Sequence, residues 1–447
     1  MTQAAVVKEN QWTNISQLTD AVSGDVREKL ENLGVKIQKD LALRYNPVQF
    51  RNDGGKLNIR MSGIAGQLSF HGHEILVAPK FVDNPKQGQD WSASTISMMN
   101  RVRTTRLTYT PSNFLSRGVV SFVDHVALSF ADSLKKAAKR DPIHIYKSRE
   151  EIRNSLSGRL LIDRQLQHIL KRPGTLACEV DYLDTNNDFN HALHFAAARF
   201  NALTLSPRVK ELVHQAQQSL PKISGPARLP RVIPKTPPPQ YDHYMDALEI
   251  AGDFLSGIGR STAHGNVSGY GLLLNMEQLF EKFVERCLQQ VTRTNLGDNW
   301  DLKAQYSQIY AYPENHGGKN YYTKPDNVIF KDNCPAIVLD AKYKKYSDAE
   351  ENGNSKPKNS DVYQLVASMA SNGCHVGALI YPKLDDTEND IPGNVRLWSV
   401  DFNQVKMIVG AITLDLGRLH DSSAILDLER HLADDLGSLL NHRPVTQ

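Results

Sequence analysis

The residues best suited to chemistry lie in residues 324–343, which read KPDNVIFKDNCPAIVLDAKY. Two runs rich in β-branched and aromatic residues flank a polar turn, and this pattern predicts a β-hairpin. We expect Phe330 to pair with Ala336, and Val328 to pair with Val338. The register matters because it decides which polar side chains share a face of the hairpin.

In that register, two carboxylates and one lysine lie together. Asp326 stands opposite Asp340, with Cβ atoms roughly 4.5–5.5 Å apart, and Lys342 lies two residues after Asp340 on the same face. Opposed carboxylates repel, and Mg²⁺ would stabilise them because it binds one or two carboxylates together with water and phosphate oxygens. Lys342 would orient the metal-bound water or stabilise negative charge at phosphorus. The pattern predicts Mg²⁺-assisted phosphodiester hydrolysis; the alternative is a surface hairpin with an exposed ion pair.

Two further polar residues are candidates for the same site. Residues 271–290 predict a helix in which Glu277, Glu281 and Glu285 form a column at i, i+4 spacing. We expect Glu281 to add a carboxylate to the site, whereas the alternative is a solvated acidic stripe. Gln364, on a later predicted helix, would position the attacking water or the DNA backbone; the alternative is an exposed amide.

Other motifs exclude several kinds of chemistry. His191 and His194 have the i, i+3 spacing of metal ligands, but no third ligand follows, which favours ordinary, partly buried histidines. The sequence has no GxxxxGK[ST] phosphate loop, so we do not expect this chain to hydrolyse nucleotides itself. It also has no GxSxG nucleophile elbow.

The composition is that of a globular protein. The 447 residues are 40% hydrophobic and 23% charged, and the net charge of +3 identifies no partner. Four widely spaced cysteines argue against a zinc ribbon or a secreted disulfide framework and favour the cytoplasm. The sequence has no export signal and no apolar run approaching about 18 residues, so we expect no membrane span.

Charge is concentrated in residues 101–172, which contain 15 Lys and Arg against 6 Asp and Glu. This surplus suits contact with phosphates or with an acidic protein surface. The alternative is a solvated helical face.

The elements that must position these residues fall into an α/β, multi-domain fold. Alternation predicts strands over residues 56–61, 67–70 and 74–81, with a turn at His71-Gly72, in a β-meander or open barrel. Helical periodicity follows, as at Ile162 and Leu166, and an α/β half ends the chain. Seven prolines lie between about residues 220 and 240 and indicate a linker. We expect an N-terminal helical extension, a β-rich and helical domain, a Pro-rich linker and a C-terminal domain at residues 1–44, 45–219, 220–240 and 241–447.

With these motifs, the C-terminal half resembles the PD-(D/E)xK nucleases and their restriction-endonuclease-like α/β domain. The chain as a whole is similar to the McrC family, the nuclease subunit of McrBC-type restriction systems. The likeness covers roughly residues 45–400. The pieces that carry it are residues 279–283, 324–326, 339–343 and 361–365, and upstream Gly63, Gly66, Leu68, residues 78–81 and residues 149–179.

The resemblance implies partners and residue roles. McrC-like proteins bind a hexameric McrB-like AAA+ GTPase, insert their N-terminal part into its channel and stimulate GTP hydrolysis, so residues 45–219 would bind that motor. Asp326, Asp340 and the Ala341 carbonyl would hold Mg²⁺, Lys342 would be the catalytic lysine, and Glu281 and Gln364 would be accessory. Two features depart from the family pattern. Ser368 stands where many relatives have tyrosine, and residues 1–44 precede the β-region.

The expected function is that of a Mg²⁺-dependent DNA endonuclease subunit, which cuts modified (methylated) double-stranded foreign DNA in a GTP-driven antiphage complex. Two other functions are considered. One is a non-catalytic activator or scaffold of an AAA+ motor, and the other is a free-standing DNA repair nuclease.

Overall fold

The structure is a computed structural model. It describes residues 5–15, 26–54, 56–70, 73–82, 91–102, 122–168, 171–203, 205–234, 236–257, 269–314, 318–345, 356–384, 395–402, 405–419 and 422–442. The chain forms two compact units: unit 1 comprises Met1–Tyr109 and Ser261–Gln447, and unit 2 comprises Thr110–Arg260. Unit 1 is therefore built from both ends of the sequence. The division into four segments made above stays a prediction.

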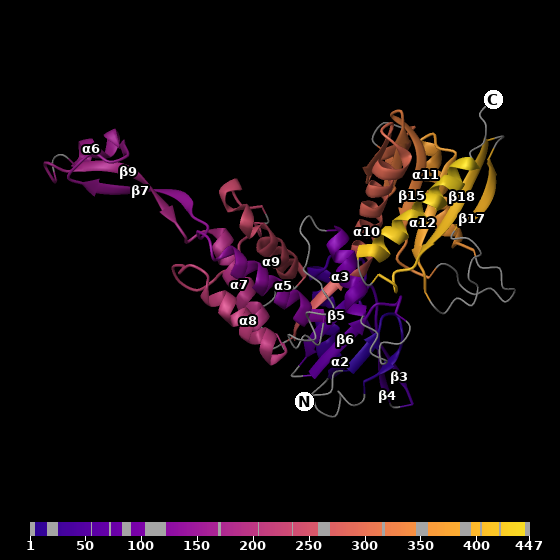
Figure 1. The fold of residues 1–447 in the computed structure, drawn as a ribbon, viewed down its shortest axis with the longest axis horizontal. Coiled ribbons are helices and arrows are strands. Elements are labelled where there is room, and N and C mark those ends of the chain that lie inside the picture. Colours follow the sequence, from indigo (N-terminus) through magenta and orange to yellow (C-terminus); the bar gives the residue numbers. More distant parts are fainter. Residues whose placement is uncertain are drawn as a thin grey trace. The chain divides into compact units, whose positions relative to one another are not determined.

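The C-terminal part of unit 1 is built on a six-stranded mixed sheet of order β11-β14-β15-β16-β18-β17 (Figure 1). Strands β15, β16 and β18 run parallel to one another, and the outer strands are antiparallel to their neighbours. Every residue of β16 is buried, as expected for a parallel strand covered on both faces. The strands are β11 (Trp300–Ala304), β14 (Asn327–Lys331), β15 (Cys334–Ala341), β16 (Val376–Pro382), β17 (Val395–Phe402) and β18 (Val405–Leu414).

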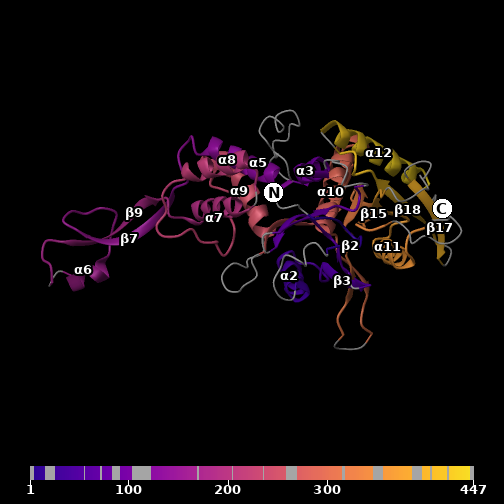
Figure 2. The same ribbon diagram turned by 90° about the horizontal axis from the view of Figure 1, so that it is seen from below.

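Helices cover both faces of this sheet, and Figure 2 shows α12 and α11 on opposite sides of it. Phe280 and Leu432 share one buried cluster with Leu339, whereas Leu365 shares another with Val338. Neighbouring residues of β15 thus face different cores, as alternation in a strand requires. This layered arrangement confirms the predicted α/β class. The helices are α10 (Met276–Val291), α11 (Asn359–Ser371) and α12 (Ser422–Asn441).

The N-terminal part of unit 1 contains two small sheets, of order β1-β6-β5-β10 and β2-β4-β3. Leu30 and Leu33 of α2 pack with Ile59 and Val77 in their shared core. The predicted β-region is present, and its described strands form open sheets. These elements and their neighbours are β1 (Ala5–Lys8), β2 (Thr13–Asn14), α2 (Val26–Asp40), β3 (Val48–Asp53), β4 (Lys56–Met61), β5 (Ile64–Phe70), β6 (His73–Ala78), α3 (Trp91–Val102) and β10 (Gly269–Asn275). Next to α10 and α11 of the C-terminal part lie the short π-helix η3 (Thr292–Leu296) and a two-stranded sheet of β12 (Gln308–Ala311) and β13 (Tyr321–Thr323).

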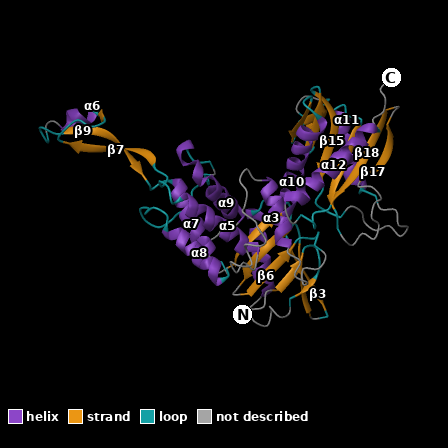
Figure 3. Cartoon of the chain, in the orientation of Figure 1, coloured by secondary structure: helices purple, strands orange, loops and turns teal. Residues whose placement is uncertain are grey.

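Unit 2 combines a helical bundle with a long hairpin, seen in Figure 3 as paired strands leading to α6. The rings of Phe130, Phe200 and Phe254 stack in the bundle core. The helix predicted around Ile162 and Leu166 is present as α6, and both of these apolar side chains are 66% exposed. The elements are α5 (Phe122–Ala137), β7 (Ile145–Arg153), β8 (Arg159–Leu160), α6 (Ile162–His168), β9 (Leu176–Asp184), α7 (Asp188–Ala202), α8 (Pro207–Gln218), the 3₁₀ turn η2 (Pro239–Tyr244) and α9 (Met245–Gly257).

One predicted helix begins later than expected. The helix placed over residues 271–290 begins at Met276, because the preceding residues form β10, paired antiparallel with β5. Asn275 caps α10 by accepting a hydrogen bond from the Gln278 N–H at 3.0 Å. The predicted turn at His71-Gly72 and residues 103–121 of the basic stretch lie outside the described residues. Within the described part of the chain, we find no helix with the length and apolar character needed to cross a membrane.

Candidate active site

The β14–β15 hairpin positions the central residues of the candidate site. Its turn residues Asp332 and Asn333 have φ of 50° and 63°, the left-handed values that a two-residue type I′ turn requires. The predicted pairing of Val328 with Val338 is confirmed. The predicted pairing of Phe330 with Ala336 is wrong, since Phe330 pairs with Pro335 across a register shift after Ile329. Pro335 has no N–H to donate, so a bulge beside it interrupts the ladder at little further cost.

The regular register next to the bulge brings the two aspartates to the same end of the hairpin. Asn327 pairs with Leu339, so the residues one step further along are Asp326 and Asp340. Asp326 precedes β14, and its Oδ2 accepts the Ala341 N–H at 2.8 Å. Asp340 is only 4% exposed. The predicted proximity of the two residues is thus present in the structure.

The Lys342 ammonium lies between this strand and α11. Its Nζ is 2.5 Å from Oδ2 of Asp340 and donates to Oε1 of Gln364 at 3.0 Å. Gln364 is therefore in contact with the lysine, and its role in positioning the water or the DNA backbone stays a prediction. An ammonium has three N–H donors. The hydrogen bond to Gln364 uses one of them, and the contact with Asp340 is an ion pair. A further donor can therefore serve a water molecule or a phosphate oxygen.

A glutamine that sequence reasoning missed completes the cluster. The Gln305 side chain donates to Oε1 of Glu281 at 2.5 Å and to Oδ1 of Asp326 at 3.1 Å. The backbone N–H of Gln305 donates to the Asp326 carbonyl at 2.8 Å. The sequence feature that could have identified Gln305 is the strand that precedes it. Ala304 in that strand pairs with Asn327, and this pairing sets Gln305 beside Asp326. Finding it required knowing that β11 pairs with β14.

Of the three glutamates in the predicted column, only Glu281 reaches the cluster. Glu277 accepts a hydrogen bond from the Tyr45 hydroxyl at 2.7 Å, and Glu285 accepts one from Gln289 at 2.9 Å. Glu277 and Glu285 therefore have partners elsewhere on unit 1. The choice of Glu281 agrees with this geometry.

The cluster carries more negative charge than its single lysine balances. Burial, followed by the charges of Asp340 and Glu281, raises the pKa of Asp326 to about 7. Burial, followed by the charges of Asp340 and Glu285, raises the pKa of Glu281. Neighbouring carboxylates thus make Asp326 and Glu281 harder to ionise. A cation joining the cluster would reverse this effect.

The donor set fits a small, hard cation. Oδ2 of Asp340 is buried and accepts no hydrogen bond within the described residues, and its one close partner there is the Lys342 ammonium. Oxygen ligands of this type suit Mg²⁺. Across the described ranges, no group of three or more His, Cys, Asp and Glu side chains is arranged to hold a metal. A site here would therefore combine two carboxylates with a backbone carbonyl and water.

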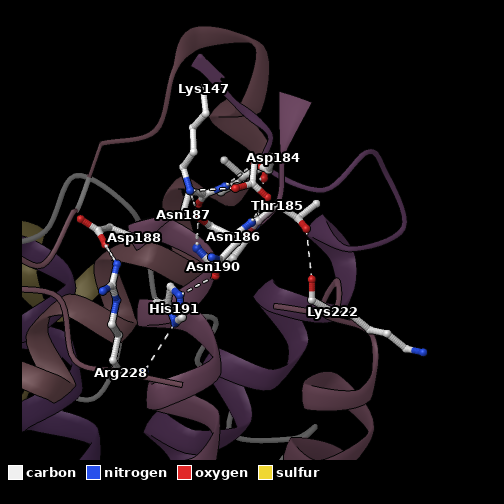
Figure 4. A network of polar contacts seen from close by, with 11 residues as sticks. Lys147, Asp184, Thr185, Asn186, Asn187, Asp188, Asn190, His191, Lys222 and Arg228 are labelled. Atoms are coloured by element: carbon white, nitrogen blue, oxygen red, sulfur yellow. Dashed lines mark hydrogen bonds and ion pairs between the residues drawn. The ribbon is translucent and has the colours of Figure 1, made fainter. Parts of the chain in front are cut away.

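The two histidines have structural roles. His191 Nε2 lies 2.8 Å from Asn186 Oδ1, and His194 Nε2 lies 2.8 Å from the Pro221 carbonyl. Figure 4 shows His191 within a polar network at the base of the hairpin, and burial lowers its pKa. Both rings thus have hydrogen-bond partners within the protein, which agrees with the interpretation as ordinary histidines. In the basic stretch, several described side chains pair with nearby carboxylates, as Arg159 does with Glu179.

Comparisons with known proteins found one family profile and two solved structures that match this chain. A family profile described as "McrBC 5-methylcytosine restriction system component" matches residues 59–382. A refined half-complex of Thermococcus gammatolerans McrB AAA+ hexamers with bound McrC contains a chain with a TM-score of 0.64 and 16% identity, over 97% of this chain and all of that one. A second T. gammatolerans McrBC structure matches 65% of this chain and 88% of its own, at 16% identity and a TM-score of 0.48. No curated protein matches the sequence.

Proposed function

The chain belongs to the McrBC family of 5-methylcytosine restriction system components, and from that membership we propose that it is the McrC-type nuclease subunit. Its substrate would be modified double-stranded DNA, and its reaction hydrolysis of a phosphodiester bond. The observation that carries the proposal is the meeting of Asp326, Asp340 and Lys342 at one end of the hairpin, with Glu281, Gln305 and Gln364 in contact around them.

Each residue has a distinct role in this reaction. Asp326, Asp340 and the Ala341 carbonyl would hold Mg²⁺, which when bound supplies charge neutralisation at the phosphodiester. Gln305 holds both Asp326 and Glu281 through its amide, which fixes the direction of the Asp326 carboxylate. A carboxylate that is already held in place does not have to reorient when the reaction begins, so it adds no reorganisation energy to the barrier.

Lys342 acts at the attacking water or at the scissile phosphate. Asp340 and Gln364 hold its ammonium, the first by an ion pair and the second by a hydrogen bond, so a donor remains for the reacting group. From that place Lys342 stabilises the negative charge that develops at phosphorus.

We also propose that the partner is an McrB-like AAA+ GTPase hexamer, since McrC is bound to such hexamers in the matched half-complex. The hairpin of unit 2 suits this role by its surface. Seven apolar side chains on its strands and tip are exposed: Tyr146, Ile152, Leu156, Leu160, Ile162, Leu166 and Leu183. Apolar surface concentrated on a projecting element is typical of a protein interface.

The four cysteines form no disulfide, which agrees with a cytoplasmic site of action.

The test is cleavage by the reconstituted complex of this chain, its AAA+ partner, GTP and Mg²⁺ on a duplex containing 5-methylcytosine. Asp340→Ala and Lys342→Ala should abolish cleavage while leaving assembly and GTPase stimulation intact. Asp301→Asn is the matched control, because Asp301 is an exposed carboxylate on β11 of the same sheet. Its cleavage should equal that of the unchanged chain.

Three results would contradict the proposal. Cleavage at the unchanged rate by Asp340→Ala would refute the assigned site. GTPase stimulation without cleavage by any form would favour the non-catalytic activator. Cutting by the isolated chain with Mg²⁺ alone, at the rate of the full complex, would favour a free-standing nuclease.

A further inference from the structure

Residues of the N-terminal region contact the nuclease-like part of unit 1 in one buried polar cluster. We call this cluster, formed by Glu9, Gly63, Lys80 and Tyr343, the joint. The segment Ala78-Pro79-Lys80-Phe81 ends β6, and Phe81 packs in the same cluster as Tyr343. The Gly63 carbonyl accepts the N–H of Met276, the first residue of α10, at 3.0 Å. These contacts lie outside the chemistry described above.

Glu9, immediately after β1, is the centre of the joint. It is 1% exposed, and its Oε1 accepts the Gly63 N–H at 2.9 Å. Its Oε2 accepts the Lys80 N–H at 3.1 Å and the Tyr343 hydroxyl at 2.8 Å. Three donors from distant parts of the sequence therefore converge on one buried carboxylate.

Lys80 connects this carboxylate to the strand that carries the candidate site. The side chain is 8% exposed, and its Nζ lies 3.9 Å from Oε1 of Glu9. The same Nζ donates to the Tyr343 carbonyl at 2.7 Å and lies 3.5 Å from the centre of the Tyr343 ring. Lys80 thus holds both the backbone and the side chain of the residue that follows Lys342.

Holding Tyr343 decides where Lys342 points. Strand β15 ends at Ala341, and one more backbone bond, from the Lys342 N–H to the Ile380 carbonyl at 2.8 Å, continues the pairing. Successive side chains of an extended backbone point to opposite sides. With Tyr343 fixed in the core, Lys342 must face Asp340 and Gln364 on the other side of the sheet.

We propose that Lys80, held by Glu9, is a positioning residue for Lys342. This inference rests on the proposed nuclease function and adds to it the group that holds the catalytic strand from behind. Stability alone is a weak reason for a lysine at this place, since apolar residues of similar size often replace a buried ion pair without loss of stability.

The key variant is the double substitution Glu9→Gln/Lys80→Met, which removes both charges and leaves neither one buried alone. Tyr343→Phe is a milder second variant that keeps the ring and loses only the bond to Glu9. The control is Glu429→Gln, which breaks the buried ion pair of Glu429 with Arg101 elsewhere in unit 1. All are made in the full chain and assembled with the AAA+ partner.

Two measurements test the role. In the complex with GTP, Mg²⁺ and methylated duplex, the double variant should lower kcat by about 10- to 100-fold, with KM for DNA and GTPase stimulation unchanged. Hydrogen exchange of the Lys342 and Lys344 amides should become at least about tenfold faster, while the amides of β16 keep their protection. Tyr343→Phe should change both measurements in the same direction by less, and Glu429→Gln should change neither.

The outcomes separate this inference from the function on which it rests. If the unchanged complex cuts, Asp340→Ala does not, and the double variant cuts at the full rate, positioning by Lys80 is refuted and the nuclease stands. If no form cuts DNA, the exchange data still decide, because unchanged Lys342 and Lys344 amides in the double variant would overturn the proposal. A loss of kcat that matches loss of folded protein, with Glu429→Gln equally affected, would mean a structural role only.

Discussion

Replacing Asp326 with asparagine should stabilise unit 1 at neutral and alkaline pH in the absence of metal. The pKa of Asp326 is raised from 3.8 to about 7 by burial, by Asp340 and by Glu281. Between these two values the folded chain binds this proton and the unfolded chain does not, so stability falls as the pH rises through the window. Above pH 7 the folded state holds a buried charge that Asp326→Asn removes.

The magnitude follows from the width of the window. Each pKa unit corresponds to about 1.4 kcal/mol, and two units of the window lie between pH 5 and pH 7. The unfolding free energy of Asp326→Asn relative to the unchanged chain should therefore rise by about 3 kcal/mol from pH 5 to pH 8. Comparing the two proteins cancels the contribution of raised carboxyl groups that do not interact with Asp326, such as Asp435.

Tryptophan fluorescence during urea unfolding in EDTA is a suitable assay. The four tryptophans, Trp12, Trp91, Trp300 and Trp398, all belong to unit 1, so the signal reports on that unit. Asp301→Asn on β11 is the control and should follow the unchanged chain at every pH. The reasoning is refuted if Asp326→Asn has the same pH slope as the unchanged chain, or is less stable than it at pH 8.

Metal binding gives a second arm to the same experiment. At pH 8, Mg²⁺ in place of EDTA should raise the stability of the unchanged chain, since a ligand that binds only the folded state adds to its stability. It should add less to Asp326→Asn, which has lost one carboxylate. Equal stabilisation of the two proteins would place the ion elsewhere.

Three further predictions concern residues outside the candidate site. Burial raises the pKa of Asp435 on α12 to about 7, so Asp435→Asn should also stabilise unit 1 at pH 8 and not at pH 5, as measured by the same fluorescence assay. A Cβ at Gly66, where φ is 136°, would lie 2.0 Å from the Leu272 carbonyl oxygen, so Gly66→Ala should lower the urea midpoint by separating β5 from β10. Phe200→Ala removes a ring stacked on Phe254 at 3.6 Å and should cost about 3–5 kcal/mol in unit 2, measured by circular dichroism because that unit has no tryptophan.

The sequence predicted the local features of the site well, because they depend on short-range alternation. Strand β4 has the predicted limits, residues 56–61, and the hairpin has the predicted Val328–Val338 pair. Alternation alone then assigns Asp340 and Lys342 to one face. The error at Phe330 arose from treating Pro335 as an ordinary strand residue, although it cannot donate to the ladder.

The features that were missed depend on contacts between distant parts of the sequence. Gln305 becomes part of the site only because β11 pairs with β14. Residues 269–275 continue the apolar pattern of α10, and only their pairing with β5 makes them a strand. The contact of Glu9 with Tyr343 joins residues 334 positions apart. Periodicity within one element carries no information about such pairings.

Unit 1 contains two buried polar clusters that balance charge in different ways. At the joint, Glu9 meets Lys80 and three hydrogen-bond donors, so its carboxylate is fully satisfied. At the hairpin, Lys342 pairs with Asp340, and the pKa values of the neighbouring Asp326 and Glu281 are raised. The same unit thus neutralises one buried carboxylate and leaves a surplus of charge among three others. A surplus of buried negative charge is expected where a cation and a substrate complete the cluster. The contrast with the joint therefore favours a functional role for the hairpin carboxylates over a purely structural one.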